Sequence, residues 1–249
     1  MAPSPSGAVV VSHATSPSDF YVRLRTHEDR LTSFHDSLAT AMLHAESHPV
    51  KPASGQSYAA AIAQPFDPTS QNPSKVSWRR VTVLAVSSSI QNQVQVCLVD
   101  VGCIKFLRCD DLRRFPADQP SFTSTPAFAL PCRLPNIIPS ASSPSWSKVA
   151  CEFFASLVSA HPLFFVDFRQ PDNNERGADA GVGGKAEMDL YVGVSTDASA
   201  LDVGTKVALR VAQVLVEEEL ADWSADTADS GGRIFLTWAI FLTPGPLPL

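Results

Sequence analysis

The sequence has no cysteine pair of the CxxC type and no apolar run long enough to cross a membrane. Its five cysteines, at positions 97, 103, 109, 132 and 151, are odd in number and scattered. This favours reduced, mostly buried thiols in a cytoplasmic setting over a disulfide framework or a zinc site. The longest apolar run, residues 234–242, is about half of the roughly 20 residues that a membrane-spanning helix needs. We therefore expect neither structural disulfides nor a membrane anchor.

Basic residues do not predominate either. The 249 residues include 19 Lys and Arg against 25 Asp and Glu, so the net charge is −6. A mildly acidic chain is not steered broadly to nucleic acid or to anionic membranes, although a local basic patch still can be. The N-terminus lacks a basic segment followed by an apolar stretch, so we expect no secretory signal. Apolar residues make up 45% of the chain, which is typical of globular domains that bury a core.

The clearest periodicity is that of β-strands in the middle of the chain. Residues 78–86 alternate between apolar and polar, a polar turn follows, and residues 94–99 and 104–107 continue the pattern on either side of a tight turn at residues 100–102. Short strands separated by turns are typical of a small antiparallel barrel. We expect Val81, Val83 and Ala85 to face its interior, because alternate residues of a strand share one face.

Further strands and helices flank this middle segment. Apolar residues at helical spacing, Leu31, Phe34, Leu38 and Met42, predict a helix. A second helix is predicted over residues 145–158, with Ser145 as its N-cap and Trp146, Val149, Phe153 and Leu157 on one face. Residues 206–223 are predicted to end in a helix. Strands are predicted at residues 8–11, 19–24, 57–63, 128–134, 163–168 and 188–194.

Six segments, in this order, resemble the extended Tudor domain: VVVSHATSPSDFYVRL, SWRRVTV, VQVCLVDVG, DDLRRFP, FALPCRLPNIIP and VAQVLVEEELADW. Together they cover about residues 8–223. The resemblance implies a mainly β fold with helices, in which a five-stranded Tudor barrel is inserted into an OB-like, staphylococcal-nuclease-like half and joined to it by a helix. The Tudor core would span residues 54–117 and the nuclease-like half residues 8–48 and 127–223. Residues 224–249 match nothing in the family and stay unassigned.

The resemblance also places the site at which family members read methylated arginine. Those members hold the dimethylated guanidinium in an aromatic cage, because π-faces attract a bulky, poorly hydrated cation, and an asparagine at the rim binds it. The equivalent positions here are Arg79, Leu98, Val101 and Cys103. None supplies an aromatic ring or an amide, and Arg79 would repel a cationic ligand. The resemblance therefore predicts a degenerate methylarginine cage.

Two alternatives stay open in that alignment. The last cage aromatic belongs to the preceding strand, where Tyr58 and Phe66 are the candidates. A slip of one residue would put Trp78 in the cage and restore a conventional dimethylarginine reader, but it would turn the alternating valines of the same strand outward. We expect Trp78 to pack in the core instead.

A local basic cluster offers a different function. It consists of Lys105, Arg108, Arg113 and Arg114, beside two phenylalanines. Such residues could contact RNA phosphates or an acidic partner. Since two aspartates at positions 110 and 111 lie within the cluster, a self-neutralised surface is the default expectation. The alternative function is therefore single-stranded RNA binding by the OB-like half.

Catalytic signatures are not evident. The nuclease-like half lacks the clustered carboxylates that a metal-dependent nuclease needs, and His44 and His48 have no third metal ligand near them. We expect no enzyme activity, no cofactor and no metal. By resemblance the chain is a scaffold or protein-interaction module of a cytoplasmic small-RNA (piRNA) ribonucleoprotein pathway, in germ or ribonucleoprotein granules. Its partners would be Piwi-type or other ribonucleoprotein components, with RNA secondary and no membrane.

Overall fold

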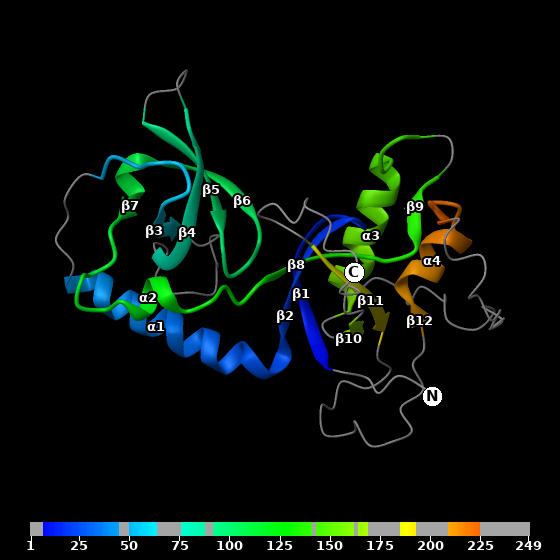
Figure 1. The fold of residues 1–249 in the computed structure, drawn as a ribbon, viewed down its shortest axis with the longest axis horizontal. Helices are drawn as coiled ribbons and strands as arrows, with labels where there is room; N and C mark the ends of the chain where they lie inside the picture. Colours follow the sequence, from blue (N-terminus) through cyan, green and yellow to red (C-terminus); the bar gives the residue numbers. More distant parts are fainter. Residues whose placement is uncertain are drawn as a thin grey trace, which may run out of the picture.

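Two larger sheets, each with its own core, lie side by side in the molecule (Figure 1). The computed structural model describes residues 7–44, 50–63, 76–87, 92–140, 143–161, 164–168, 185–192 and 209–224. The unassigned tail predicted from residue 224 on therefore lies outside the described residues, apart from its first residue. So do Phe66 and His48.

The first sheet, here called the barrel sheet, has five antiparallel strands in the order β6-β5-β4-β3-β7. They are β3 (Ser57–Ala63), β4 (Val76–Val86), β5 (Gln93–Leu98), β6 (Ile104–Arg108) and β7 (Leu112–Arg113). Val81 and Val83 of β4 are buried in its core, as the alternation predicts. Ala85 is exposed instead, because the register between β4 and β5 shifts after Val83. Such a bulge reverses which face the following residues present.

The second sheet takes its strands from both sides of the barrel sheet in sequence. Its strands are β1 (Ala8–Ser16), β2 (Asp19–Leu24), β8 (Leu130–Arg133), β10 (Phe164–Phe168), β11 (Ala186–Val192) and β12 (Leu209–Arg210). Their order is β10-β1-β2-β8-β11-β12, and an additional pairing of β10 with β11 closes the ring. The result is an OB-like barrel into which the barrel sheet is inserted. The exact domain boundaries stay predictions.

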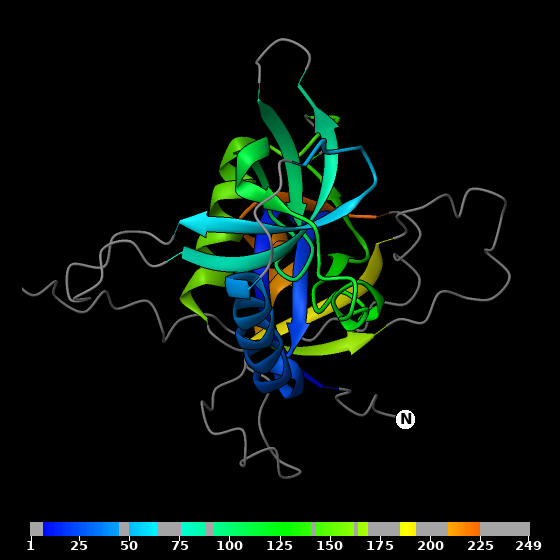
Figure 2. The same cartoon turned by 90° about the vertical axis from the view of Figure 1, so that its left-hand side faces the viewer.

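Helix α1 (Glu28–His44) joins the two sheets, preceded by the short helix η1 (Arg25–His27). It follows β2 through η1 and packs Leu38, Ala41 and Met42 against Ala59 of the barrel sheet. Figure 2 views the molecule from the barrel side and shows α1 below the barrel strands. The helical spacing seen in the sequence is thus confirmed, and its apolar face is what attaches the helix to the barrel.

Helix α3 (Lys148–Ala160) covers the core of the second sheet. Its N-cap is Ser147, whose Oγ accepts a hydrogen bond from the backbone N–H of Ala150 at 3.1 Å, so the prediction of Ser145 as N-cap is wrong. The buried residues include Ala150 and Phe154, whereas Val149 is 62% exposed. Apolar residues lie on more than one face of α3, so the sequence allows either face to be the buried one. Packing against β1 determines which face it is.

The C-terminal helix is shorter than predicted. Helix α4 (Val211–Glu217) ends where Glu219 adopts a φ of 58° and the N–H of Leu220 bonds back to Leu215. This left-handed residue terminates the helix, and residues 221–223 form β13 (Ala221–Trp223), which pairs with β9 (Ile137–Pro139). A further single helical turn, α2 (Ser121–Ser124), connects the barrel sheet to the second sheet.

Candidate functional site

The turn between β5 and β6 lies at the contact between the two sheets. The N–H groups of Val101 and Gly102 bond to the carbonyl of Leu98 at 3.0 and 2.7 Å, and the N–H of Leu98 bonds to the carbonyl of Cys103 at 2.9 Å. These bonds close a tight turn, as predicted. Gly102 has a φ of +90°, a conformation that favours glycine.

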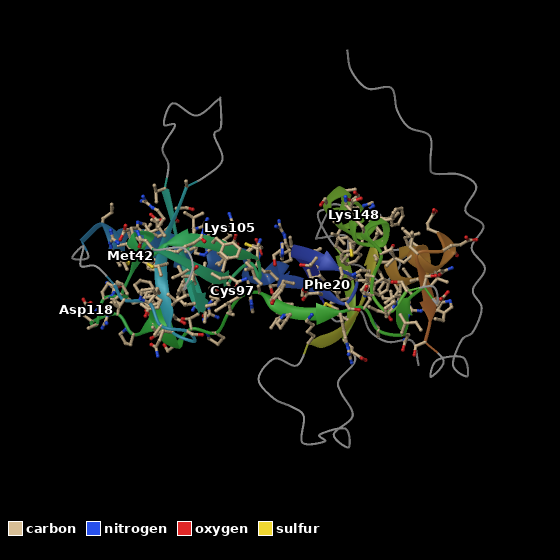
Figure 3. All side chains as sticks on the ribbon, turned by 90° about the horizontal axis from the view of Figure 1, so that it is seen from above. Phe20, Met42, Cys97, Lys105, Asp118 and Lys148 are labelled. Atoms are coloured by element: carbon tan, nitrogen blue, oxygen red, sulfur yellow. The ribbon has the colours of Figure 1, made fainter. Side chains whose placement is uncertain are left out.

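Side chains of β1 and β2 hold this turn from the other sheet. Ser12 Oγ donates a hydrogen bond to the carbonyl of Val101 at 2.8 Å. The ring of Tyr21 lies against Gly102 so closely that a Cβ there would collide with Tyr21 Cγ. Figure 3 shows Cys97, at the end of β5, on the side of the barrel sheet that faces Phe20 of β2. The turn is thereby fixed between the two halves of the fold.

Asp100 in this turn also forms a buried ion pair, which the sequence did not indicate. It is 2% exposed and forms a two-pronged ion pair with Arg80 of β4, with Oδ1–Nη2 at 2.6 Å and Oδ2–Nε at 3.0 Å. The backbone N–H of Phe128 also bonds to Oδ1, at 3.1 Å. Burial alone would raise the pKa of Asp100, but the approach of His35 Nε2 to 3.7 Å and the bonds and charge of Arg80 lower that pKa to about 2. Asp100 is therefore a buried structural anion.

The guanidinium of Arg80 ties three segments together. Its Nη1 donates to the carbonyls of Phe122 and Thr125, and its Nη2 donates to that of Pro126 at 3.0 Å. The guanidinium carbon also lies 4.5 Å from the ring centre of Phe34 on α1, within the range of a cation–π contact. The sequence showed an alternating strand and a turn, and it could not show that distant groups converge on this pair.

The four positions equivalent to the aromatic cage lie together at one end of the barrel sheet, which we call the barrel mouth: Arg79, Leu98, Val101 and Cys103. Leu98 is buried and pairs with Val81, and Val101 and Cys103 are half-buried against the same core. Arg79 precedes Val81 by two residues, so it shares that face of β4. The side chains at the barrel mouth are thus aliphatic, thiol and guanidinium, without an aromatic ring among the four.

The two described aromatic candidates from the sequence lie in different places: Tyr58 belongs to the same core cluster as Leu98, Val101 and Cys103, whereas Trp78 does not. Tyr58 is buried opposite Val81, and its hydroxyl accepts a hydrogen bond from the N–H of Ala53 at 3.2 Å. Trp78 packs against the cluster that contains Leu38 of α1, on the other face of β4. Its place in this packing agrees with the expectation that Trp78 is a core residue.

Residues of the predicted basic cluster point in different directions. Along β6, Lys105 and Arg108 pair with Val96 and Gln93 and so face opposite sides of the strand. Arg108 pairs with Asp111 at 3.3 Å, and Arg113 Nη1 bonds to the carbonyls of residues 110 and 112. Arg114 is exposed. The structure thus separates the four residues more than their spacing in the sequence suggests.

In the part of the chain that the structure describes, no group of three or more His, Cys, Asp or Glu side chains could hold a metal ion. No described helix is both long and apolar enough to cross a membrane. A shallow hollow of about 570 Å³ lies between α1 and the segment after β7, at Asp36, Ala41, Pro116 and Asp118, and none of the barrel-mouth residues lines it.

The chain belongs to the Tudor domain family, whose model matches residues 3–136. Its fold is that of an extended Tudor domain. It superposes on the human TDRD1 extended Tudor domain in complex with a symmetrically dimethylated peptide, with a TM-score of 0.65 and 20% identity, over 88% of this chain and 90% of that one.

Two other relatives are a second extended Tudor domain and a much longer protein. An aspartate-to-alanine variant of the Drosophila melanogaster Papi extended Tudor domain, in complex with an unmethylated Piwi N-terminal peptide, superposes with a TM-score of 0.64 and 20% identity, over 88% of this chain and 99% of that chain. Mouse RING finger protein 17 is 27% identical over 144 residues, which are 58% of this chain. The match spans only 8% of that protein's length.

Proposed function

We propose that this chain is a non-catalytic protein-interaction module whose barrel mouth binds partners without requiring arginine methylation. One observation carries the proposal: Arg79, Leu98, Val101 and Cys103 occupy the cage-equivalent positions on a Tudor barrel whose β4–β5 register shifts only after Val83, beyond the pairing of Val81 with Leu98. A dimethylarginine gains about 0.5–2 kcal/mol from each aromatic face in a desolvated site. Without those faces, the methyl groups add little to binding.

The surroundings support a surface for protein partners. The turn that carries Val101 and Cys103 is held rigidly between the two sheets by Ser12 and Tyr21, and a rigid site costs little conformational entropy on binding. Among the structural neighbours, the aspartate-to-alanine variant of the Papi domain forms a complex with an unmethylated peptide as well as with a dimethylated one. For this chain we infer partners of a cytoplasmic small-RNA ribonucleoprotein, of Piwi type or other components.

Restoring the cage tests the proposal. The variant would carry Arg79→Tyr, Leu98→Tyr, Val101→Tyr and Cys103→Asn, with Arg79→Tyr alone as a milder companion in case the full variant does not fold. Fluorescence anisotropy would compare one Arg-Gly peptide, unmodified and symmetrically dimethylated, on each protein, and circular dichroism would check folding. We expect a preference for the methylated peptide to appear only on restoration. A natural chain that already prefers the methylated peptide would contradict the proposal.

A further inference from the structure

The guanidinium of Arg79 is half-buried and has no carboxylate partner among the described residues. Within the same residues its one hydrogen bond runs from Nη1 to the carbonyl of Trp78, at 3.2 Å. Arg80, the next residue, differs completely: it is 4% exposed and every nitrogen of its guanidinium bonds to Asp100 or to a carbonyl. A guanidinium carries five N–H donors, so most donors of Arg79 have no partner among the described residues.

Burial is costly for such an unpaired cation. It lowers the pKa of Arg79 from its ordinary value, which reports that the protein environment disfavours the charge. The charges of Asp100 and Asp36 offset only part of this effect on the pKa of Arg79, and Val101 and Cys103 add aliphatic and thiol surface without charge. A group held in this way gains from any ligand that brings a negative charge to it.

We propose that the barrel mouth is an oxyanion site, in which Arg79 pairs with an acidic side chain of a partner peptide while the half-buried Val101 and Cys103 contact the apolar part of that peptide. This inference rests on the proposed function and specifies its ligand: the Tudor position that takes a cation in an aromatic cage takes an anion here. A planar guanidinium binds a carboxylate or a phosphate through two parallel bonds. The acidic side chain is thus glutamate, aspartate or a phosphorylated serine or threonine.

The charges around Arg79 favour an anionic ligand. Arg23, whose charge acts on Arg79, carries its own counter-ion, Glu28, at 2.8 Å. Asp100, which would oppose an incoming anion, is already engaged by Arg80 at 2.6 Å. The charge complementarity of the barrel mouth is therefore to an anion, and an arginine side chain, methylated or not, would meet a like charge.

An array of 12-residue peptides tests the site. Each peptide has a central Glu, phosphoserine, Gln, Arg or symmetric dimethylarginine, flanked by varied apolar and polar residues. The labelled chain is compared with Arg79→Gln and with Arg114→Gln, an exposed arginine on the same half that serves as the matched control. A charge-assisted bidentate bond predicts at least about tenfold tighter binding for Glu or phosphoserine than for Gln. This preference should vanish in Arg79→Gln and persist in Arg114→Gln.

The outcomes separate the two proposals. Preference for only phosphoserine or only glutamate would support the site and identify the source of its anion. Equal binding of all central residues would overturn the oxyanion site but leave a methylation-independent interaction module intact. Preference for dimethylarginine would overturn both. Binding of none of the peptides, or an acidic preference that survives in Arg79→Gln, would overturn the oxyanion site.

Discussion

Replacing Asp100 by asparagine perturbs the buried ion pair that connects the barrel sheet to α1. The carboxylate is 2% exposed, and it accepts two bonds from Arg80 and one from the N–H of Phe128. Asparagine keeps the shape but removes the charge, so the buried guanidinium of Arg80 loses its counter-ion. Removing one member of a buried pair costs about 3–5 kcal/mol, and we expect the free energy of unfolding to fall by that amount.

Urea unfolding, followed by tryptophan fluorescence, measures this loss. The matched control is Glu187→Gln, which breaks the ion pair of Glu187 with Arg133 at 2.7 Å, where the two side chains are 38% and 55% exposed. An exposed pair contributes at most about 1 kcal/mol. Combining Asp100→Asn with Arg80→Met should cost less than the sum of the single changes, because the double variant leaves no buried charge of this pair. An effect of Asp100→Asn no larger than that of Glu187→Gln would refute the reasoning.

Three smaller predictions follow from the same contacts. The pKa of Asp100 falls from 3.8 to about 2 on folding, so its contribution of about 2 kcal/mol is present above pH 4 and lost as the pH falls towards 2; the acid unfolding curve of Asp100→Asn should be flatter there. Gly102→Ala should lower the free energy of unfolding by about 1–3 kcal/mol or more, because a Cβ there would collide with the ring of Tyr21. Gly55 is also at positive φ but has nothing within 4 Å of an added Cβ, so Gly55→Ala should cost less in the same melting experiment. Ser147→Ala should remove about 1 kcal/mol of helix-capping stability, whereas alanine at the serine two residues earlier should leave the melting temperature unchanged.

Much of the fold follows from patterns local to one element. Helix α1 and the valines of β4 show the helical and strand periods directly, so their burial could be predicted. The exposure of Ala85 could not, because a bulge depends on how β5 pairs with β4 and leaves no local signal. The early end of α4 depends on Glu219 in the left-handed region, where glycine is the usual residue and the sequence shows glutamate.

The candidate site was accessible to sequence reasoning only through the family resemblance. The spacing of Arg79, Leu98, Val101 and Cys103 matches no independent chemical motif, and their proximity depends on strand register. The role of Asp100 was missed, because its partners come from β4, from α1 and from the segment around Phe128. A weak signal existed: β4 carries two adjacent arginines and Asp100 follows β5, but the sequence does not show which of these charges are buried.

The most direct test of the central claim, that the barrel mouth is not a methylarginine cage, is a calorimetric titration of the natural chain. One Arg-Gly-rich peptide would be titrated twice, unmodified and with its central arginine symmetrically dimethylated, in the same buffer. Leu98, Val101 and Cys103 offer no π-face and Arg79 repels a cation, so we predict equal affinities or no heat from either peptide. A clear preference for the dimethylated peptide would contradict this and restore the usual reader function.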